Sequence, residues 1–173
     1  MAETPEDTPT PDDAAAEGAA AAPQIGIESQ YVRDLSFENP QGPNTANAVR
    51  QGPEVSIEIN TNARPLEGDG RYEVTLFIRA EAKTKEATVF ICELTYGGVF
   101  VLANVPDEAL SPVLLIEGPR LLFPFARSIV ADATREGGVP PLLINPVDFV
   151  QLYQERHMRG AGNGSDEGTD DGA

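Results

Sequence analysis

The sequence has very few of the side chains from which catalytic and metal sites are usually built. Its 173 residues include one cysteine, Cys92, and one histidine, His157. A single cysteine excludes a disulfide within the chain, and one residue of each type cannot close a zinc site of nitrogen and sulfur ligands. Cys92 alternates with Phe90 and Leu94, so we expect it to be a small buried hydrophobe rather than a nucleophile. His157 lies near the end of a predicted helix, where a solvated side chain is expected.

Basic residues are missing from both ends of the chain. Residues 1–22 and 160–173 contain Asp and Glu but no Lys or Arg, and they carry most of the formal net charge of −16. Low hydrophobicity with charge of one sign predicts a disordered acidic tail on each side of one domain, residues 23–159. The chain also lacks the clustered Lys and Arg that nucleic-acid binding needs, whereas a basic protein partner fits its charge.

Long apolar runs and nucleotide-binding loops are absent as well. Every apolar run meets a proline or a charge before the ~20 residues that a membrane-spanning helix needs, so we expect no membrane span. No positively charged segment followed by an apolar one opens the sequence, which predicts no signal peptide and a cytoplasmic protein. Neither glycine-rich phosphate-binding pattern occurs and no catalytic constellation is found, so we expect no enzyme activity, no cofactor and no bound metal.

Alternating apolar and polar residues predict β-strands at residues 31–38, 55–66, 72–79 and 87–95, the last resuming at 99–102. Short turns connect the last three strands, which predicts an antiparallel meander. Strict alternation in the first strand places Tyr31 with Phe37 on one face and Asp34 with Glu38 on the other. Residues 39–54 are rich in proline and glycine, which indicates a long irregular crossover loop that returns the first strand to a sheet edge.

The apolar stretch from Leu110 to Ala133 predicts a long helix, bent by its prolines and broken near Gly118. Leu122 and Phe125 begin a helical repeat that predicts the face toward the core. The apolar surface is wider than one core face needs, so part of it is expected to contact another subunit. A helix buried on all sides within one chain is the alternative. The predicted contact comprises Leu114, Leu115, Leu121, Leu122 and Phe125.

A shorter helix closes the domain, with Asn145 predicted as its N-cap and Gly160 at its end. Because all strands precede all long helices, the predicted class is α+β. We expect a four-stranded antiparallel sheet with a long crossover loop after the first strand. A long proline-kinked helix and the shorter C-terminal helix should lie on one face.

Four stretches of the chain together resemble the SecB family of protein-export chaperones. They are QYVRDLSFENP at 30–40, FICELTYGGVF at 90–100, LLFPFAR at 121–127 and PPLLINPVDFVQLY at 140–153, within a similarity that covers about residues 25–158. The resemblance implies a homotetramer, a dimer of dimers, that binds unfolded preproteins without ATP. It also implies that the tetramer delivers them to the export motor SecA.

The resemblance further implies which residues meet these partners. The SecA-binding face corresponds to Asp34, Glu38, Ile91 and Glu93. A period of two independently places Ile91 and Glu93 opposite the apolar side of their strand. The implied client groove lies between the crossover loop and the helical layer, with candidates Phe37, Val49, Leu102, Phe123 and Leu143.

Two other functions stay open at this point. One is a specialised chaperone that serves a single partner, for example an antitoxin, which a client-range test would separate from general export. The other is an α+β domain that binds a small ligand under the crossover loop, since apolar pockets are common in proteins.

Overall fold

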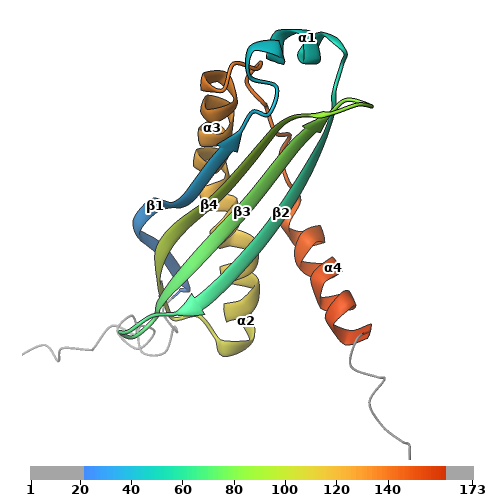
Figure 1. Cartoon of the computed structure of the whole chain (residues 1–173). Coiled ribbons are helices and arrows are strands. Elements are labelled where there is room, and N and C mark those ends of the chain that lie inside the picture. Colours follow the sequence, from blue (N-terminus) through green and yellow to red (C-terminus); the bar gives the residue numbers. More distant parts are fainter. Residues whose placement is uncertain (1–21, 163–173) are drawn as a thin grey trace, which may run out of the picture.

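The computed structural model describes residues 22–162 (Figure 1). Most of the two predicted acidic tails, residues 1–21 and 163–173, therefore lies outside the described part. Within it the elements are β1 (Gln24–Glu38), η1 (Gly42–Asn44), α1 (Thr45–Arg50), β2 (Glu54–Pro65), β3 (Arg71–Lys83), β4 (Thr88–Ala103), α2 (Asp107–Pro112), η2 (Val113–Glu117), α3 (Gly118–Glu136) and α4 (Phe149–Gly162). No helix among residues 22–162 combines the length and the apolar character needed to cross a membrane.

The four strands form one antiparallel sheet in the order β1-β4-β3-β2. This confirms the predicted meander, and the crossover segment brings β1 beside β4. Alternate residues of β3 and β4, among them Leu76, Ile78, Leu94 and Phe100, are fully buried under the helices. Figure 1 shows α2 and α3 behind the sheet, with no helix in front of it. We call the uncovered side the open face.

β1 is longer than predicted and is not a regular strand. Its pairing with β4 shifts twice, at Glu28 between Ile27 and Ser29, and at Arg33 between Val32 and Asp34. Each shift inserts one extra residue, which reverses the alternation of the side chains beyond it. The prediction that Tyr31 and Asp34 lie on opposite faces is therefore wrong.

The crossover segment contains two short helices, so the prediction that it is wholly irregular is wrong. Asn39 organises its start: the Asn39 Oδ1 accepts hydrogen bonds from the backbone N–H groups of Gln41 and Gly42, each at 3.1 Å. The Thr45 hydroxyl donates to the same oxygen at 3.0 Å. Pro43 sits at the start of η1, where a missing N–H costs nothing. These local side-chain hydrogen bonds thus stabilise regular structure in a segment where the proline and glycine content predicted none.

The long helix is not broken near Gly118 but changes its winding there. In η2 the chain follows the wider π pattern, with the Gly118 N–H bonded to the carbonyl of Val113, five residues earlier. Pro112 and Pro119 flank this segment, and neither has an N–H to donate, so the α pattern is disturbed on both sides. A Cβ at Gly118 would lie 3.1 Å from the Val74 side chain, which shows how closely this turn packs on the sheet.

The buried face of α3 differs from the predicted one. Leu122, Ala126, Val130 and Thr134 recur at every fourth residue and are completely buried, whereas Phe125 points outward. The prediction that Leu122 and Phe125 share the core face is therefore wrong. Side chains three residues apart and side chains four residues apart both lie on one helix face. The sequence therefore did not decide between the predicted set with Phe125 and the observed set with Ala126.

The N-cap of α4 is Asp148 rather than Asn145. The Asp148 Oδ1 accepts hydrogen bonds from the backbone N–H groups of Val150 and Gln151, both at 3.0 Å. Residues 140–148 belong to no helix or strand, as expected of a segment that begins with consecutive prolines. α4 then runs along the β2 side of the sheet (Figure 1), where the Arg156 guanidinium donates to the main-chain carbonyl of Thr61.

Candidate functional site

The four residues predicted to form an acidic docking face lie together on the open face. Glu38 stands opposite Ile91 in the β1–β4 pairing, and Asp34 stands opposite Thr95, two residues from Glu93. Asp34 and Glu38 are exposed, while Ile91 and Glu93 are half-buried. A partly exposed isoleucine thus lies between Glu38 of β1 and Glu81 of β3, with Glu93 two residues and Thr95, opposite Asp34, four residues further along β4.

Glu93 is held in place by a cation from the neighbouring strand. The Arg79 guanidinium of β3 pairs with Glu93 directly across the strands and reaches Glu81 at 3.6 Å. Lys83 pairs with Glu81 at 2.8 Å. The hydrogen bond that Arg79 donates to Glu93 raises the pKa of Arg79, and the hydrogen bond from Lys83 lowers the pKa of Glu81. Within residues 22–162 this row of ion pairs does not include Asp34 or Glu38, which leaves their negative charges unpaired on the open face.

A second polar cluster at the other half of the open face was missed by sequence reasoning. The Glu73 carboxylate is only 5% exposed and accepts hydrogen bonds from the Tyr31 hydroxyl and the Arg64 guanidinium. Arg33 lies 3.6 Å from the same carboxylate. The Tyr31 bond, followed by Arg64, lowers the pKa of Glu73 against the opposing effect of burial. Burial and the Glu73 charge raise the pKa of Tyr31 and keep its hydroxyl a donor.

An apolar pocket of about 200 Å³ opens on the helix side of the sheet, beneath the crossover segment. Its walls come from that segment, the ends of β2, β3 and β4, and the chain after α3: Val49, Pro53, Val55, Ala82, Val89, Phe90, Val139, Pro140, Pro141 and Leu142. Thr134 fixes the last wall, because its hydroxyl oxygen accepts the Leu142 N–H at 2.9 Å. The volume falls below the ~300–1,000 Å³ of common small-molecule sites.

The predicted groove residues do not form one site. Val49 lines the apolar pocket, and Phe37 stacks on the pocket residue Phe90 with ring centroids 5.8 Å apart. Phe123 is buried against Phe149, and Leu102 is buried near the β2–β3 turn, hydrogen-bonded to Gly70. Leu143 is exposed beside α3. Sequence alone gave no signal for the proline and valine walls, because they meet only through the tertiary fold.

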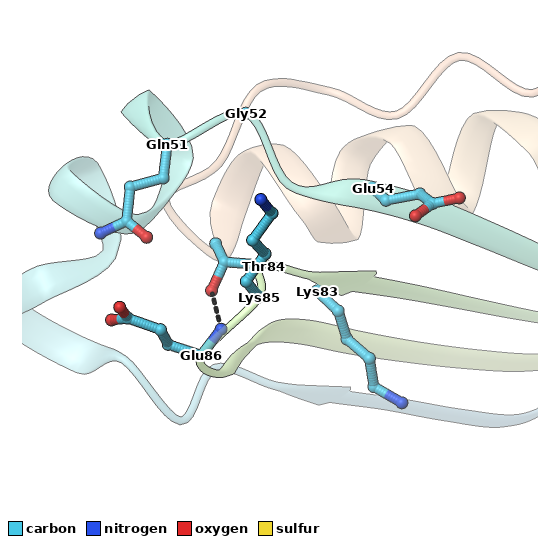
Figure 2. Close-up of a pocket in the computed structure, with 7 residues that line it drawn as sticks. All are labelled: Gln51, Gly52, Glu54, Lys83, Thr84, Lys85 and Glu86. Carbon is cyan, nitrogen blue, oxygen red and sulfur yellow. Dashed lines mark hydrogen bonds between the residues drawn. The ribbon is translucent and has the colours of Figure 1, made fainter.

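A polar cavity of about 430 Å³ adjoins the same end of the sheet, lined by Gln51, Gly52, Glu54, Lys83, Thr84, Lys85 and Glu86. Figure 2 shows the Lys83 and Lys85 side chains pointing apart, so the two ammonium groups do not converge on an anion. The Thr84 hydroxyl accepts the Glu86 N–H at 3.3 Å and closes the turn. The arrangement is that of a solvated hairpin end.

The residues predicted to contact another subunit are divided by the fold. Leu114 and Leu122 are buried in the core of their own chain, so their inclusion in that contact is wrong. Leu115 is half-buried. Leu121 and Phe125, one helical turn apart, are 40% and 51% exposed. The outward side of α3 therefore presents two large apolar side chains.

Cys92 is completely buried in β4, and burial raises the pKa of its thiol. It is packed as a small hydrophobe, as predicted. Across residues 22–162, no three His, Cys, Asp or Glu side chains gather closely enough to hold a metal ion.

A family model described as "Preprotein translocase subunit SecB" matches residues 18–160. The chain is 55% identical over 142 residues to "Protein-export protein SecB" of Azorhizobium caulinodans, covering 82% of this chain and 88% of that protein. It is 52% identical over 143 residues to the protein of the same name in Bradyrhizobium sp., covering 83% and 88%.

A solved structure shares the fold at much lower identity. It is the SecB-like chaperone of Mycobacterium tuberculosis in complex with a peptide from an antitoxin. The TM-score is 0.59 at 16% identity, and the match covers 71% of this chain and 90% of that one.

Proposed function

The chain belongs to the SecB family, and on that premise we propose how it works as a protein-export chaperone. It is a chaperone, not an enzyme. We propose a holdase of the cytoplasm that binds unfolded preproteins without ATP, assembles as a dimer of dimers and passes its clients to SecA.

The apolar pocket is the observation that carries client binding. The lining consists of ten residues, all without polar side-chain atoms, so it suits a side chain of an unfolded segment but offers no side-chain group to orient a small polar ligand. One such contact is weak. A long client that occupies pockets on several subunits gains affinity through multivalency, because each further contact is intramolecular.

Client binding is tested with a chemically blocked, permanently unfolded polypeptide and no nucleotide, by size exclusion with light scattering. The expected result is a complex of one tetramer with one client. Val49→Arg, which places a charge in the pocket, should weaken capture. The matched control is Val150→Arg, at an exposed valine of α4. Equal capture by both variants would place the client elsewhere.

The open face is the second proposed binding surface. In the described part of the chain Asp34 and Glu38 carry unpaired negative charge, Glu38 stands opposite Ile91, and Glu93 extends the row. Carboxylates around a small apolar centre suit a basic partner surface, with charge setting the approach and the isoleucine adding buried area. This arrangement supports docking of SecA on the open face.

Charge reversal tests that docking. Asp34→Arg and Glu38→Arg should weaken binding of SecA at low salt and remove most of its salt dependence. Glu136→Arg, at an exposed carboxylate on α3, is the control and should bind normally. Unchanged binding by both β1 variants at low ionic strength would refute this surface.

A chaperone restricted to one partner is the second candidate, favoured by the shared fold with a chaperone solved with an antitoxin peptide. A client-range assay separates the two. Capture of several unrelated unfolded chains supports general export, whereas capture of one supports the specialised function.

A further inference from the structure

We propose that the cluster of Tyr31, Arg33, Arg64 and Glu73, here called the Glu73 clamp, is a positioning device for the docking surface on the open face. It holds the bulge at Arg33 in β1 and thereby turns Asp34 and Glu38 toward the partner. The role in docking rests on the function proposed above, while the mechanical role in β1 does not.

The bulge decides which way the acidic residues point. Upstream of it Val32 pairs with Tyr96 on the helix side, and downstream Asp34 pairs with Thr95 on the open face. Without the extra residue, Asp34 would stand opposite Leu94, which is completely buried. Because side chains alternate with a period of two, a shift of one residue would move both Asp34 and Glu38 to the helix side.

Apolar burial fixes this part of β1 only weakly. Ile27, Val32 and Leu35 face the helix side by register, yet they remain 38%, 47% and 44% exposed. Edge strands with little buried apolar surface slip and fray most readily. Within the single chain, polar contacts must therefore contribute to holding β1 in register.

The Glu73 clamp supplies that hold by reaching across β4. Tyr31 and Arg33 belong to β1, Glu73 to β3 and Arg64 to β2, so one carboxylate joins three strands. Gly97 of β4 makes the crossing possible. A Cβ there would lie 2.8 Å from the Tyr31 ring, so only glycine lets the ring lie over the strand. Arg33, the bulged residue itself, completes the cluster.

The other bulge of β1 is held in the same way. Its extra residue, Glu28, accepts two hydrogen bonds from Arg71 of β3, at 2.8 and 3.0 Å. Both extra residues of β1 are therefore charged, and both pair with side chains of β3, two strands away. This repeated arrangement indicates that charge pairing across β4 holds each bulge.

A disulfide reporter tests the register without any partner. In a Cys92→Ala background, Asp34→Cys with Thr95→Cys places thiols at directly paired positions. Crosslinking under mild oxidation should be fast when the clamp is intact. Glu73→Gln and Tyr31→Phe each remove a hydrogen bond to a charged group, so crosslinking should slow by about fivefold or more. Tyr31→Phe keeps the ring and serves as the milder variant if Glu73→Gln folds poorly.

Glu81→Gln is the matched control, since Glu81 lies on the same strand and face but pairs with Arg79 and Lys83 and not with β1. It should leave crosslinking unchanged. The same clamp variants, without the reporter cysteines, should weaken SecA binding while capture of an unfolded client stays normal. A general loss of folded structure would reduce SecA binding and client capture together.

The outcomes separate the two proposals. If Glu73→Gln and Tyr31→Phe leave the crosslinking rate unchanged, the clamp is refuted, regardless of the result for SecA binding. Slower crosslinking with unchanged SecA binding overturns its role in docking. If charge reversal at Asp34 and Glu38 is also without effect, the docking surface itself is refuted, while the clamp on β1 stands.

Discussion

At the scale of single residues, Glu73 shows how a buried charge is kept ionised. Among the residues whose side chains the structure describes, Glu73 is the only charged one that is buried, yet its pKa is lowered, because the Tyr31 hydroxyl and the Arg64 guanidinium hydrogen-bond to the charged form. A lowered pKa means that the folded state binds the proton more weakly than the unfolded state. The stability from Glu73 is therefore complete above the ordinary carboxyl pKa of 4.5 and is lost as the pH falls through the lowered value.

The Glu73→Gln variant tests this direction of the pH dependence of stability. At neutral pH it should destabilise the fold by about 1–3 kcal/mol, because the charge-assisted bonds are lost. The difference from the unmodified protein should shrink below the ordinary carboxyl pKa. Urea unfolding of both proteins from pH 7 to pH 3 measures it. A difference that stays constant over this range would contradict the account.

Gly137 is a second residue on which packing depends. Its backbone φ of −73° suits any amino acid, but an added Cβ would overlap the Phe37 ring. Gly137→Ala should push Phe37 off Phe90, disturb the apolar pocket and cost about 1–3 kcal/mol through overpacking. Thermal unfolding and capture of an unfolded chain measure both effects.

A compensating substitution makes that prediction specific. Phe37→Leu shortens the side chain that the alanine would meet, so the double variant should be less destabilised than the sum of the two single ones. Strict additivity in a double-mutant cycle would show that Gly137 acts through some other contact.

At the scale of elements, α4 depends on Asp148 for its start. Asp148→Ala should cost about 0.5–2 kcal/mol of helix stability and speed hydrogen exchange in the first turn of α4, because two N–H groups lose their acceptor. Asp148→Asn keeps a capping oxygen and should behave almost normally. Asn145→Ala should have no effect on α4. If hydrogen exchange in the first turn became faster in Asn145→Ala and not in Asp148→Ala, Asn145 would be the N-cap.

The same elements show what periodicity can and cannot predict. Four strands, the meander and the two longer helices follow from local apolar patterns, and the structure has them. Bulges at Glu28 and Arg33 do not follow from pattern, since their cause is pairing with Arg71 and Glu73 two strands away. Asp34, Glu38, Ile91 and Glu93 were nevertheless grouped correctly, because no bulge separates the two members of either pair.

Residues that meet only through tertiary contacts were predicted poorly. The apolar pocket joins Val49 to Val89 and Pro141, which come from three separate segments of the chain. Local propensity also failed in the crossover segment, where the Asn39 side chain replaces the missing backbone bonds. In each case the deciding interaction joins side chains that no periodic pattern links.

At the scale of the whole molecule, the sheet separates two surfaces. The apolar pocket opens on the side covered by helices, and the proposed acidic docking surface lies on the open face. Under the proposed function, a client and SecA would not compete for the same side chains. With both sites occupied at once, a client would be handed over without first being released into solution, which suits the proposed mechanism without ATP.

The proposed assembly into a tetramer would use the outer surface of α3. Leu121 and Phe125 are exposed one turn apart on α3, and Leu143, which lies near Pro124 and Ser128 of the same helix, is 67% exposed. The outer surface of α3 therefore carries more apolar surface than a lone chain needs. We expect Leu121→Ser with Phe125→Ser to reduce the tetramer to smaller species, measured by light scattering. The chain itself should lose little stability, because substitutions at exposed sites usually change it by about 0.5 kcal/mol or less.

Leu122→Ala is the control that reverses this pattern: its side chain is completely buried, so it should cost about 2–5 kcal/mol in urea unfolding. A double serine variant that keeps the full mass would place the contact between dimers on another surface.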